Sequence, residues 1–268
     1  MGIGRGQQGA FAVRRRTRRP RRPLVLRAVV GVAAAAALAA LGWWLLTSPV
    51  FAVKRVETGA YRFTSATALE SALGGLLGRN IWRVGRADAE AALATLPWVH
   101  EVRITRRLPA TVGIEFTEWR PLVAVSPADP RPGDPDLLVL VGDGRVLPFP
   151  DHLPAPGLAE LVGLAAPRGP DGRRRLDPAE LPAVLALLGA VDASGLEAAA
   201  PVDFLVARAD GFAIVLQDGR GTLLVGREEF ADRLQRYMIG REHLDQGLEI
   251  DLRFRDKITV RQPDAPQS

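Results

Sequence analysis

The hydrophobic pattern of this 268-residue chain begins with an uncharged run of 19 residues from Ala28 to Leu46. At about 1.5 Å per residue, a helix over this run reaches roughly 28 Å, close to the ~30 Å hydrocarbon core of a bilayer. Trp43 and Trp44 fall near its end, where indole rings favour the interface between headgroups and acyl chains. The run therefore predicts a single transmembrane helix over residues 28–46.

A second pattern covers residues 51–118, where strand-like alternation at both ends flanks two stretches of helical spacing. The predicted elements are a strand at 51–56, a helix capped by Thr64 or Ser65, a helix at about 86–96, and strands at 99–104 and 111–117. In the last strand, Val112, Ile114 and Phe116 alternate with Gly113, Glu115 and Thr117. This alternation predicts a hairpin with one buried face.

The pattern of residues 119–262 is richer in strands. Apolar runs of strand length lie at 122–125, 137–141, 145–147, 204–206, 213–216 and 222–225, with helices predicted at 181–188 and 228–238. Prolines make residues 126–136 a predicted exposed loop, and residues 167–175 are predicted to form another. The fold class is therefore α+β, with an N-terminal span, a β-α-α-β-β domain and a mostly antiparallel β domain.

The chain ends in two further predicted strands. Leu248, Ile250, Leu252 and Phe254 alternate with charged residues, and a short strand at 258–261 precedes a polar tail at 263–268 that we expect to be disordered. A terminal strand at a sheet edge can accept a partner strand through its unpaired backbone groups. The alternative is an edge protected from aggregation by the charges of Arg255, Lys257 and Arg261.

Charge gives the span an orientation. Nine arginines and no acidic residue lie in the tail at 1–27: Arg5, Arg14, Arg15, Arg16, Arg18, Arg19, Arg21, Arg22 and Arg27. Only Lys54 and Arg55 follow closely on the other side, so the N-terminus is predicted to be cytoplasmic. A signal peptide cleaved near Ala52 is the alternative, but the apolar run exceeds the usual ~7 to 15 residues of such peptides.

Composition limits the possible functions of the exported part. Without the nine tail arginines, 26 basic residues face 30 acidic ones, a net charge near −4. Nucleic-acid binding therefore loses its main support, because it needs a basic patch on the folded part. The chain has no cysteine, which excludes disulfides and thiolate chemistry.

Catalytic motifs are weak. The glycines of residues 4–9 match a nucleotide-binding pattern, but no strand precedes them. His100, His152 and His243 are far apart in sequence, and no serine occupies a G-x-S-x-G elbow. Carboxylates such as Asp251 are expected on a solvated or ion-paired strand face. We therefore expect no catalytic, cofactor or metal site, and interdomain or core packing for Trp98 and Trp119.

The ordered motifs resemble one known family. They are Phe51-Ala-Val53, Leu96-Pro-Trp-Val99, Arg106-Arg-Leu-Pro109, Glu118-Trp-Arg-Pro-Leu-Val-Ala124, Leu140-Val-Gly-Asp-Gly-Arg-Val146, Val225-Gly-Arg-Glu-Glu-Phe230 and Ile250-Asp-Leu-Arg-Phe254. Together with the basic tail and single span, this set resembles the FtsQ/DivIB cell-division proteins, whose exported part begins with a polypeptide-transport-associated (POTRA) domain. The resemblance implies a POTRA domain at 51–118 and a β domain at 119–262.

The resemblance also implies a function. Such proteins are non-enzymatic, single-pass scaffolds of the inner membrane at the division septum, linking early and late division proteins, with further divisome contacts through the POTRA domain. Their terminal strand region receives the small protein FtsB, whose coiled-coil companion is FtsL. By motif position, the candidate residues here are Arg253, Phe254, Asp256, Lys257, Ile258, Thr259, Val260 and Arg261. Lys257 stands where glycine is common, and no aromatic residue closes the strand. The alternative is a POTRA-bearing component of a transport or secretion system.

Overall fold

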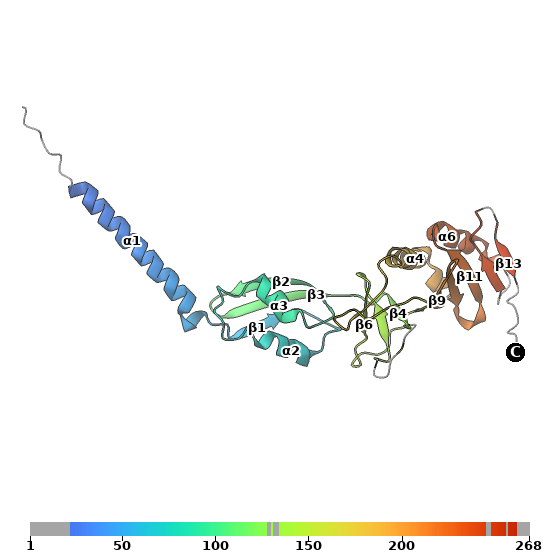
Figure 1. The fold of residues 1–268 in the computed structure, drawn as a ribbon, viewed down its shortest axis with the longest axis horizontal. Coiled ribbons are helices and arrows are strands. Elements are labelled where there is room, and N and C mark those ends of the chain that lie inside the picture. The colour runs from blue at the N-terminus through green and yellow to red at the C-terminus, as the bar shows by residue number, and fades with distance from the viewer. Residues whose placement is uncertain (1–21, 128–129, 131–133, 245–247, 256, 262–268) are drawn as a thin grey trace, which may run out of the picture.

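The structure, a computed structural model, describes residues 22–127, 130, 134–244, 248–255 and 257–261. Most of the basic tail, the polar end and Asp256 therefore lie outside the described residues. An apolar helix, a small domain with a three-stranded sheet and a region with a ten-stranded sheet follow one another along an extended molecule (Figure 1). This arrangement confirms the predicted α+β fold class.

The first element is α1 (Arg22–Thr47), which begins several residues before the predicted span. In the described part of the chain, it is the one helix long and apolar enough to cross a membrane. Its last turn is closed by the Thr47 hydroxyl, which donates to the Trp43 carbonyl at 2.7 Å. Pro49 then begins a short 3-10 helix, η1 (Pro49–Phe51), whose preceding residue Ser48 caps it through Oγ.

The small domain has the predicted element order. β1 (Arg55–Thr58), α2 (Ala66–Gly74), α3 (Arg86–Leu93), β2 (Val99–Arg107) and β3 (Thr111–Glu118) follow in sequence. β3 is central, paired parallel with β1 and antiparallel with β2. The two helices cover one face of this sheet, and their leucines meet Val112 and Ile114 in a buried core. Ser65 caps α2 by accepting a hydrogen bond from the Ala68 N–H at 3.3 Å.

The predicted first strand is wrong in its start. Residues 49–51 form η1, and β1 begins only at Arg55. The cause is long-range, because the Val53 N–H donates to the Arg79 carbonyl at 2.8 Å and Ala52 pairs with Asn80. The chain is thus held against the loop between α2 and α3 before it reaches the sheet.

The second sheet is mostly antiparallel, as predicted. Its strands are β4 (Val123–Val125), β5 (Leu138–Leu140), β6 (Arg145–Pro148), β7 (Glu160–Val162), β8 (Arg174–Arg175), β9 (Val202–Arg208), β10 (Gly211–Leu216), β11 (Gly221–Gly226), β12 (Leu248–Asp251) and β13 (Thr259–Arg261). Among the described residues, their order is β13-β12-β11-β10-β9-β7-β4-β5-β6-β8. The pairs β4·β7, β7·β9 and β11·β12 are parallel.

Two of these strands were not predicted. β7 and β8 are too short to show a period, and β8 falls inside the predicted loop at 167–175. Arg174 of β8 is nevertheless buried, donating to the Ala166 carbonyl at 2.9 Å and pairing with Asp134 at 2.9 Å. The prediction of an exposed loop is therefore wrong at its end, where a buried arginine holds the strand.

Helices cover this sheet and complete its core. α4 (Leu181–Ser194) runs beyond its predicted end and is followed by α5 (Leu196–Ala199). The 3-10 helices η2 (Gln217–Gly219) and η3 (Arg241–His243) flank β11 and α6 (Phe230–Gly240), respectively. α4 and α6 lie side by side, and the core beneath them includes Leu187, Leu205, Ile214 and Leu234.

One set of contacts closes the end of the small domain, and another joins that domain to the second region. The Glu118 carboxylate, at the end of β3, accepts hydrogen bonds from the backbone N–H groups of Arg62, Phe63 and Thr64, with shortest distances of 2.6, 3.0 and 2.7 Å. Phe63 then stacks on Trp98, with ring centroids 4.6 Å apart, and Phe149 of the second region meets both rings edge-on. Trp98 is buried, which confirms its expected packing role.

The core of the small domain provides a stability test. Ile114 is fully buried on the helix-covered face, whereas its neighbour Glu115 is exposed. We expect Ile114→Ala to lower the free energy of unfolding by about 2 to 5 kcal/mol, because a buried side chain is replaced by a cavity. Denaturant unfolding of the full chain in detergent measures it, with Glu115→Ala as the control. Equal losses in the two variants would contradict the face assignment.

Candidate partner-binding edge

The last strand lies at one edge of the large sheet. β13 pairs antiparallel with β12, with Thr259 opposite Asp251, Val260 opposite Ile250 and Arg261 opposite Glu249. No strand among the described residues pairs with its other side. The outward backbone groups of β13 are thus available to a strand from another chain.

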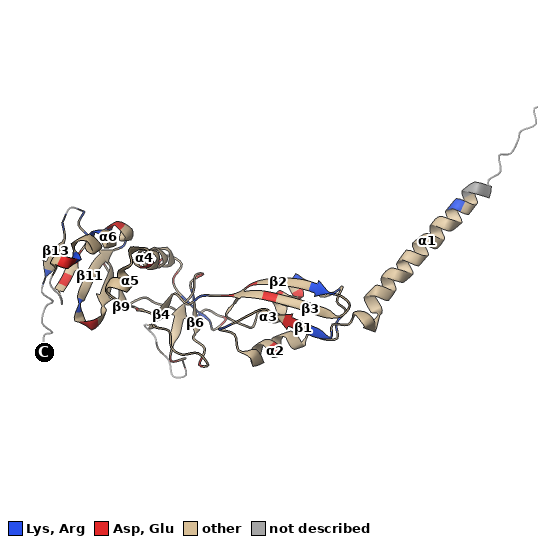
Figure 2. Ribbon diagram, turned by 180° about the vertical axis from the view of Figure 1, so that it is seen from behind, with Lys and Arg blue, Asp and Glu red and all other residues tan. Residues whose placement is uncertain are grey.

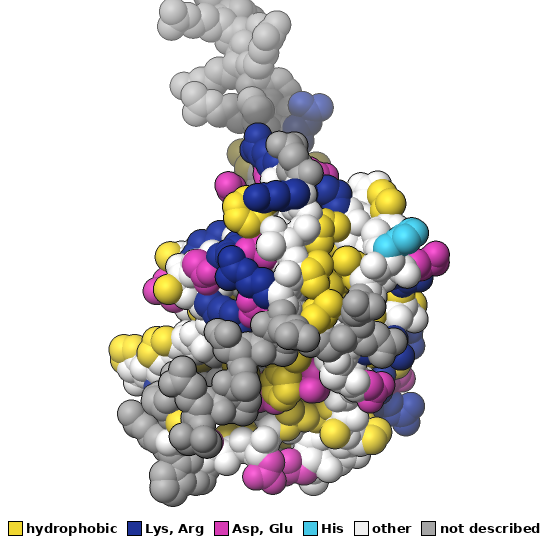
Figure 3. All heavy atoms as spheres, turned by 90° about the vertical axis from the view of Figure 1, so that its right-hand side faces the viewer, with side chains coloured by type: hydrophobic (Ala, Val, Ile, Leu, Met, Phe, Trp, Pro, Cys, Tyr) yellow, Lys and Arg dark blue, Asp and Glu magenta, His cyan; other side chains and the backbone are white. Residues whose placement is uncertain are grey.

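Side chains around this edge differ in exposure. Val260 is 40% exposed and Phe254 is 44% exposed, while Ile258 is half-buried against the core. Lys257 places its ammonium 4.9 Å from the centre of the Phe254 ring, a cation–π contact. Figure 3 looks at this end of the molecule and shows basic side chains beside a strip of hydrophobic ones. The surface therefore offers apolar and cationic contacts together.

The predicted strand over residues 248–255 is wrong in its length. β12 ends at Asp251, and Phe254 lies outside the sheet instead of on a buried face. Arg236 of α6 explains this departure. Its guanidinium donates to the carbonyl groups of Phe254 and Arg255 at 2.6 Å each, and to that of Leu252 at 3.2 Å. Carbonyl groups that leave the sheet thus find a charged donor on the adjacent helix.

An ion pair with a buried carboxylate holds the start of the segment between β12 and β13. Asp251 is 2% exposed, and its carboxylate accepts hydrogen bonds from Arg253 Nη2 at 2.7 Å and Arg253 Nε at 2.9 Å. Arg253 also pairs with Asp210. We expected Asp251 on a solvated or ion-paired face. The ion pair is present, but the side chain is buried and not solvated.

These contacts shift both ionisations. The pKa of Asp251 lies below its ordinary value, chiefly because Arg253 donates hydrogen bonds to the carboxylate. The pKa of Arg253 is raised, first by Asp251 and then by Asp210. Arg253, a candidate partner-binding residue, therefore has its guanidinium already engaged within the chain.

A second cluster of charged side chains joins α6 to the segment between β12 and β13. Glu229, just before α6, pairs with Arg255 at 2.6 Å and with the buried Arg233 at 3.3 Å. The pKa of Glu229 is lowered, mainly by Arg255 and less by Arg233. Arg233 also donates to the Val225 carbonyl at 2.7 Å, which links the helix to β11.

The structure thus separates the eight candidate residues. Lys257, Ile258, Thr259, Val260 and Arg261 lie along or next to the edge strand, Phe254 is exposed beside it, Arg253 braces it, and Asp256 lies outside the described residues. Sequence reasoning missed Arg236, Glu229 and Asp210. The predicted helix at 228–238 contained two of them, but its apolar period carries no information about which carbonyl groups its arginine reaches.

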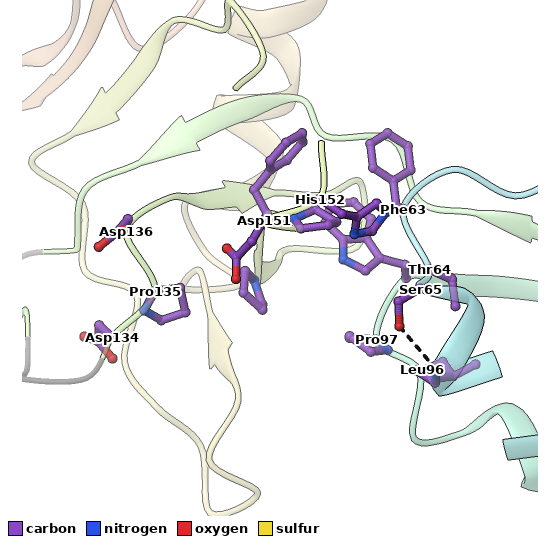
Figure 4. A pocket seen from close by; sticks show the side chains of 15 residues that line it. Phe63, Thr64, Ser65, Leu96, Pro97, Asp134, Pro135, Asp136, Asp151 and His152 are labelled. Carbon is purple, nitrogen blue, oxygen red and sulfur yellow. Dashed lines mark hydrogen bonds between the residues drawn. The ribbon is translucent and has the colours of Figure 1, made fainter. Parts of the chain in front are cut away.

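A cavity of about 570 Å³ lies between the domains (Figure 4). Thr64, Ser65 and Leu96 line one side, and Asp134 and Asp136 the other. His152, also at the cavity, has Nε2 3.3 Å from the Arg62 carbonyl. No group of three metal-ligating side chains occurs in the described part of the chain. The cavity therefore lies at the junction of the two domains, where His152 contacts the Arg62 carbonyl.

The fold defines a class of protein with an N-terminal helix long and apolar enough to cross a membrane, a small β-α-α-β-β domain and a larger, mostly antiparallel β region. Residues 51–119 match the FtsQ-type POTRA domain family. The cell division protein FtsQ of Corynebacterium glutamicum is 31% identical over 201 residues, covering 73% of this chain and 81% of the relative. FtsQ of Neisseria gonorrhoeae is 30% identical over 81% of this chain and 83% of its own length. FtsQ of Myxococcus fulvus is 32% identical over 41% of this chain and 40% of its length.

The chain belongs to the FtsQ family of cell division proteins. Membership confirms the resemblance drawn from the ordered motifs, and it gives the chain a role in cell division. The alternative of a transport or secretion component is set aside for that reason.

The Asp251 carboxylate generates a prediction about pH. Its folded pKa is lowered, so its stabilising contribution is complete above the unfolded value of about 3.9 and is lost as pH falls further. We expect Asp251→Asn to cost about 2 kcal/mol at neutral pH, because charge-assisted hydrogen bonds to Arg253 are lost. Denaturant unfolding at pH 7 and at pH 3 measures the difference, which should shrink in acid. Asp203→Asn, at an exposed position of β9, is the control and should show no such change.

Proposed function

We propose that this chain is a non-enzymatic scaffold of the division septum that spans the inner membrane once and holds an FtsB-like protein at β13. FtsL joins this assembly as the coiled-coil companion of FtsB, and the POTRA domain contacts other division proteins. The observation that carries the proposal is the terminal strand, which has a strand neighbour on one side only among the described residues. Backbone pairing across the open side supplies affinity, and Phe254 with Val260 supplies apolar contact.

The proposed orientation places the N-terminus in the cytoplasm and both exported domains in the periplasm. Its support is the asymmetry of nine arginines before the apolar run against Lys54 and Arg55 shortly after it. The proposed boundaries remain a tail at 1–27, a span at 28–46, a POTRA domain at 51–118, a β domain at 119–262 and a polar end at 263–268.

The orientation is testable with reporter fusions. A reporter that is active only outside the cytoplasm should be active when fused after Gln262 and inactive when fused at Gly9, because arginine-rich flanks stay on the cytoplasmic side. Immunoblotting of membrane fractions supplies the size of the product. A chain shortened by the mass of its N-terminal segment would indicate signal cleavage and exclude the anchor.

The edge-strand mechanism predicts an asymmetry between two neighbouring prolines. Successive backbone N–H groups of a strand point to opposite sides, so Thr259→Pro and Val260→Pro remove one donor facing β12 and one facing outward. The proline that removes the outward donor should keep the wild-type melting temperature, because it breaks no bond to β12. We expect that variant to lose at least about tenfold in affinity for an FtsB-like partner, the equivalent of ~1.4 kcal/mol. Co-purification and binding measurements on the full chain in detergent test this.

Side-chain controls separate backbone pairing from general surface effects. Phe254→Ala should also weaken partner binding, since it removes an exposed apolar side chain beside the strand. Ile239→Ala removes an equally apolar and 74% exposed side chain on α6 and should not. Unchanged binding by both folded proline variants would exclude the edge-strand mechanism, while the family membership would stand.

A further inference from the structure

The end of the POTRA domain nearest α1 exposes large apolar side chains. Leu77 is 51% exposed, Trp82 is 41% exposed and Leu108 is 55% exposed. Leu77 and Trp82 belong to the connection between α2 and α3, and Leu108 lies in the turn between β2 and β3. We call these three residues the basal apolar set.

Direct contacts hold this end against the last turn of α1. The Asn80 side chain donates to the Leu45 carbonyl at 2.9 Å. Phe51 lies between Trp44 and Trp82, with ring centroids 5.7 and 6.0 Å away. An aromatic ladder therefore runs without interruption from the apolar helix to the basal apolar set.

The hairpin turn lies at the same end. The backbone N–H of Lys54, just after the span, donates to the Ala110 carbonyl at 2.8 Å. Figure 1 shows this turn between β2 and β3 directed toward α1, away from the large sheet. Leu108 is thus brought near the end of the helix by the fold, although it lies 61 residues after Thr47 in sequence.

Basic side chains surround the apolar ones. Figure 2 shows Lys and Arg gathered at the ends of β1 and β2 that face α1. The exposed basic residues at this end are Lys54, Arg55, Arg79, Arg83, Arg106 and Arg107. Among the described residues at this end, Arg79 pairs with Asp88 at 2.6 Å and Arg107 pairs with Glu57 at 2.7 Å. Cations therefore exceed acids here, whereas residues 28–268 as a whole carry a net negative charge.

We infer that this end of the POTRA domain is a membrane-contact surface that rests in the headgroup layer of the bilayer and binds anionic phospholipids. The inference rests on the proposed membrane span, since α1 sets where the bilayer ends. Tryptophan and leucine enter the boundary between headgroups and acyl chains, and Lys54, Arg55 and Arg83 meet lipid phosphates. An exposed apolar patch rimmed by polar residues is typical of a contact site for a protein or a membrane.

This contact gives the exported part a fixed orientation. A single helix alone leaves the exported domains free to tilt on the membrane surface. A second contact through Trp82 and Leu108 restricts that tilt, and the packing of Phe149 against Trp98 transmits the restriction to the large-sheet region. β13 is then presented on the side of the molecule away from the bilayer.

Single-cysteine labelling tests the contact directly, because the natural chain has no cysteine. The full chain carries a fluorophore at Leu108→Cys, at Ala36→Cys within α1, or at Ile239→Cys on the distal helix α6. It is reconstituted in phosphatidylcholine vesicles containing phosphatidylglycerol and lipids with brominated acyl chains. We expect quenching at positions 36 and 108 and none at position 239.

The three positions distinguish the possible failures. Quenching at position 36 with position 108 as unquenched as 239 would overturn the membrane contact while the span stands. Absence of quenching at position 36 would overturn the span and this inference with it. Circular dichroism melting of each labelled chain verifies that the fold is kept.

Charge reversal tests the lipid class. Arg83→Glu should reduce quenching at position 108 several-fold in vesicles with phosphatidylglycerol, and so should vesicles of phosphatidylcholine alone. Arg173→Glu changes an exposed arginine of the β region and should leave the quenching unchanged. Quenching that is insensitive to both Arg83→Glu and phosphatidylglycerol would overturn the assignment to anionic headgroups.

Discussion

The C-terminal end of the molecule depends on one constraint. Among the described residues, β13 has a strand neighbour on one side only. Its three residues gain little from pairing with β12 alone, and the chain before it has left the sheet. Arg236 satisfies the carbonyl groups of that departing segment, and the Asp251–Arg253 pair fixes where it departs. These contacts hold the segment that precedes β13, whose second side has no strand neighbour among the described residues.

The position of β13 relative to α1 depends on contacts far from this strand. Asn80 ties the POTRA domain to the helix, Glu118 closes the entry to α2, and the Phe63–Trp98–Phe149 cluster joins the domain to the large sheet. From β4 onward, strand pairing is continuous to β13. Each of these joints consists of hydrogen bonds or aromatic contacts between folded elements. In this member of a division-protein family, a connected series of contacts therefore runs from α1 to β13.

Much of the fold was predictable because its determinants are local. The apolar run predicts α1, and the alternation of Val112, Ile114 and Phe116 predicts the hairpin of the POTRA domain. The errors have long-range causes. β1 starts late because Arg79 and Asn80 hold the preceding residues, and β8 exists because Arg174 is buried beside Asp134. No local period encodes either contact.

The candidate site also contains predictable residues and residues whose contacts are long-range. A terminal strand is expected at a sheet edge, so Thr259 to Arg261 were predictable, whereas the internal pairing of Arg253 with Asp210 joins residues 43 positions apart. Lys257 and Arg261 also reconcile the two roles that the sequence left open for this edge. Two copies pairing antiparallel about Thr259 would bring Lys257 of one opposite Arg261 of the other, and like charges directly opposite are destabilising. A strand from a partner with acidic residues at those positions meets no such repulsion, so charges that prevent self-association favour a complementary partner.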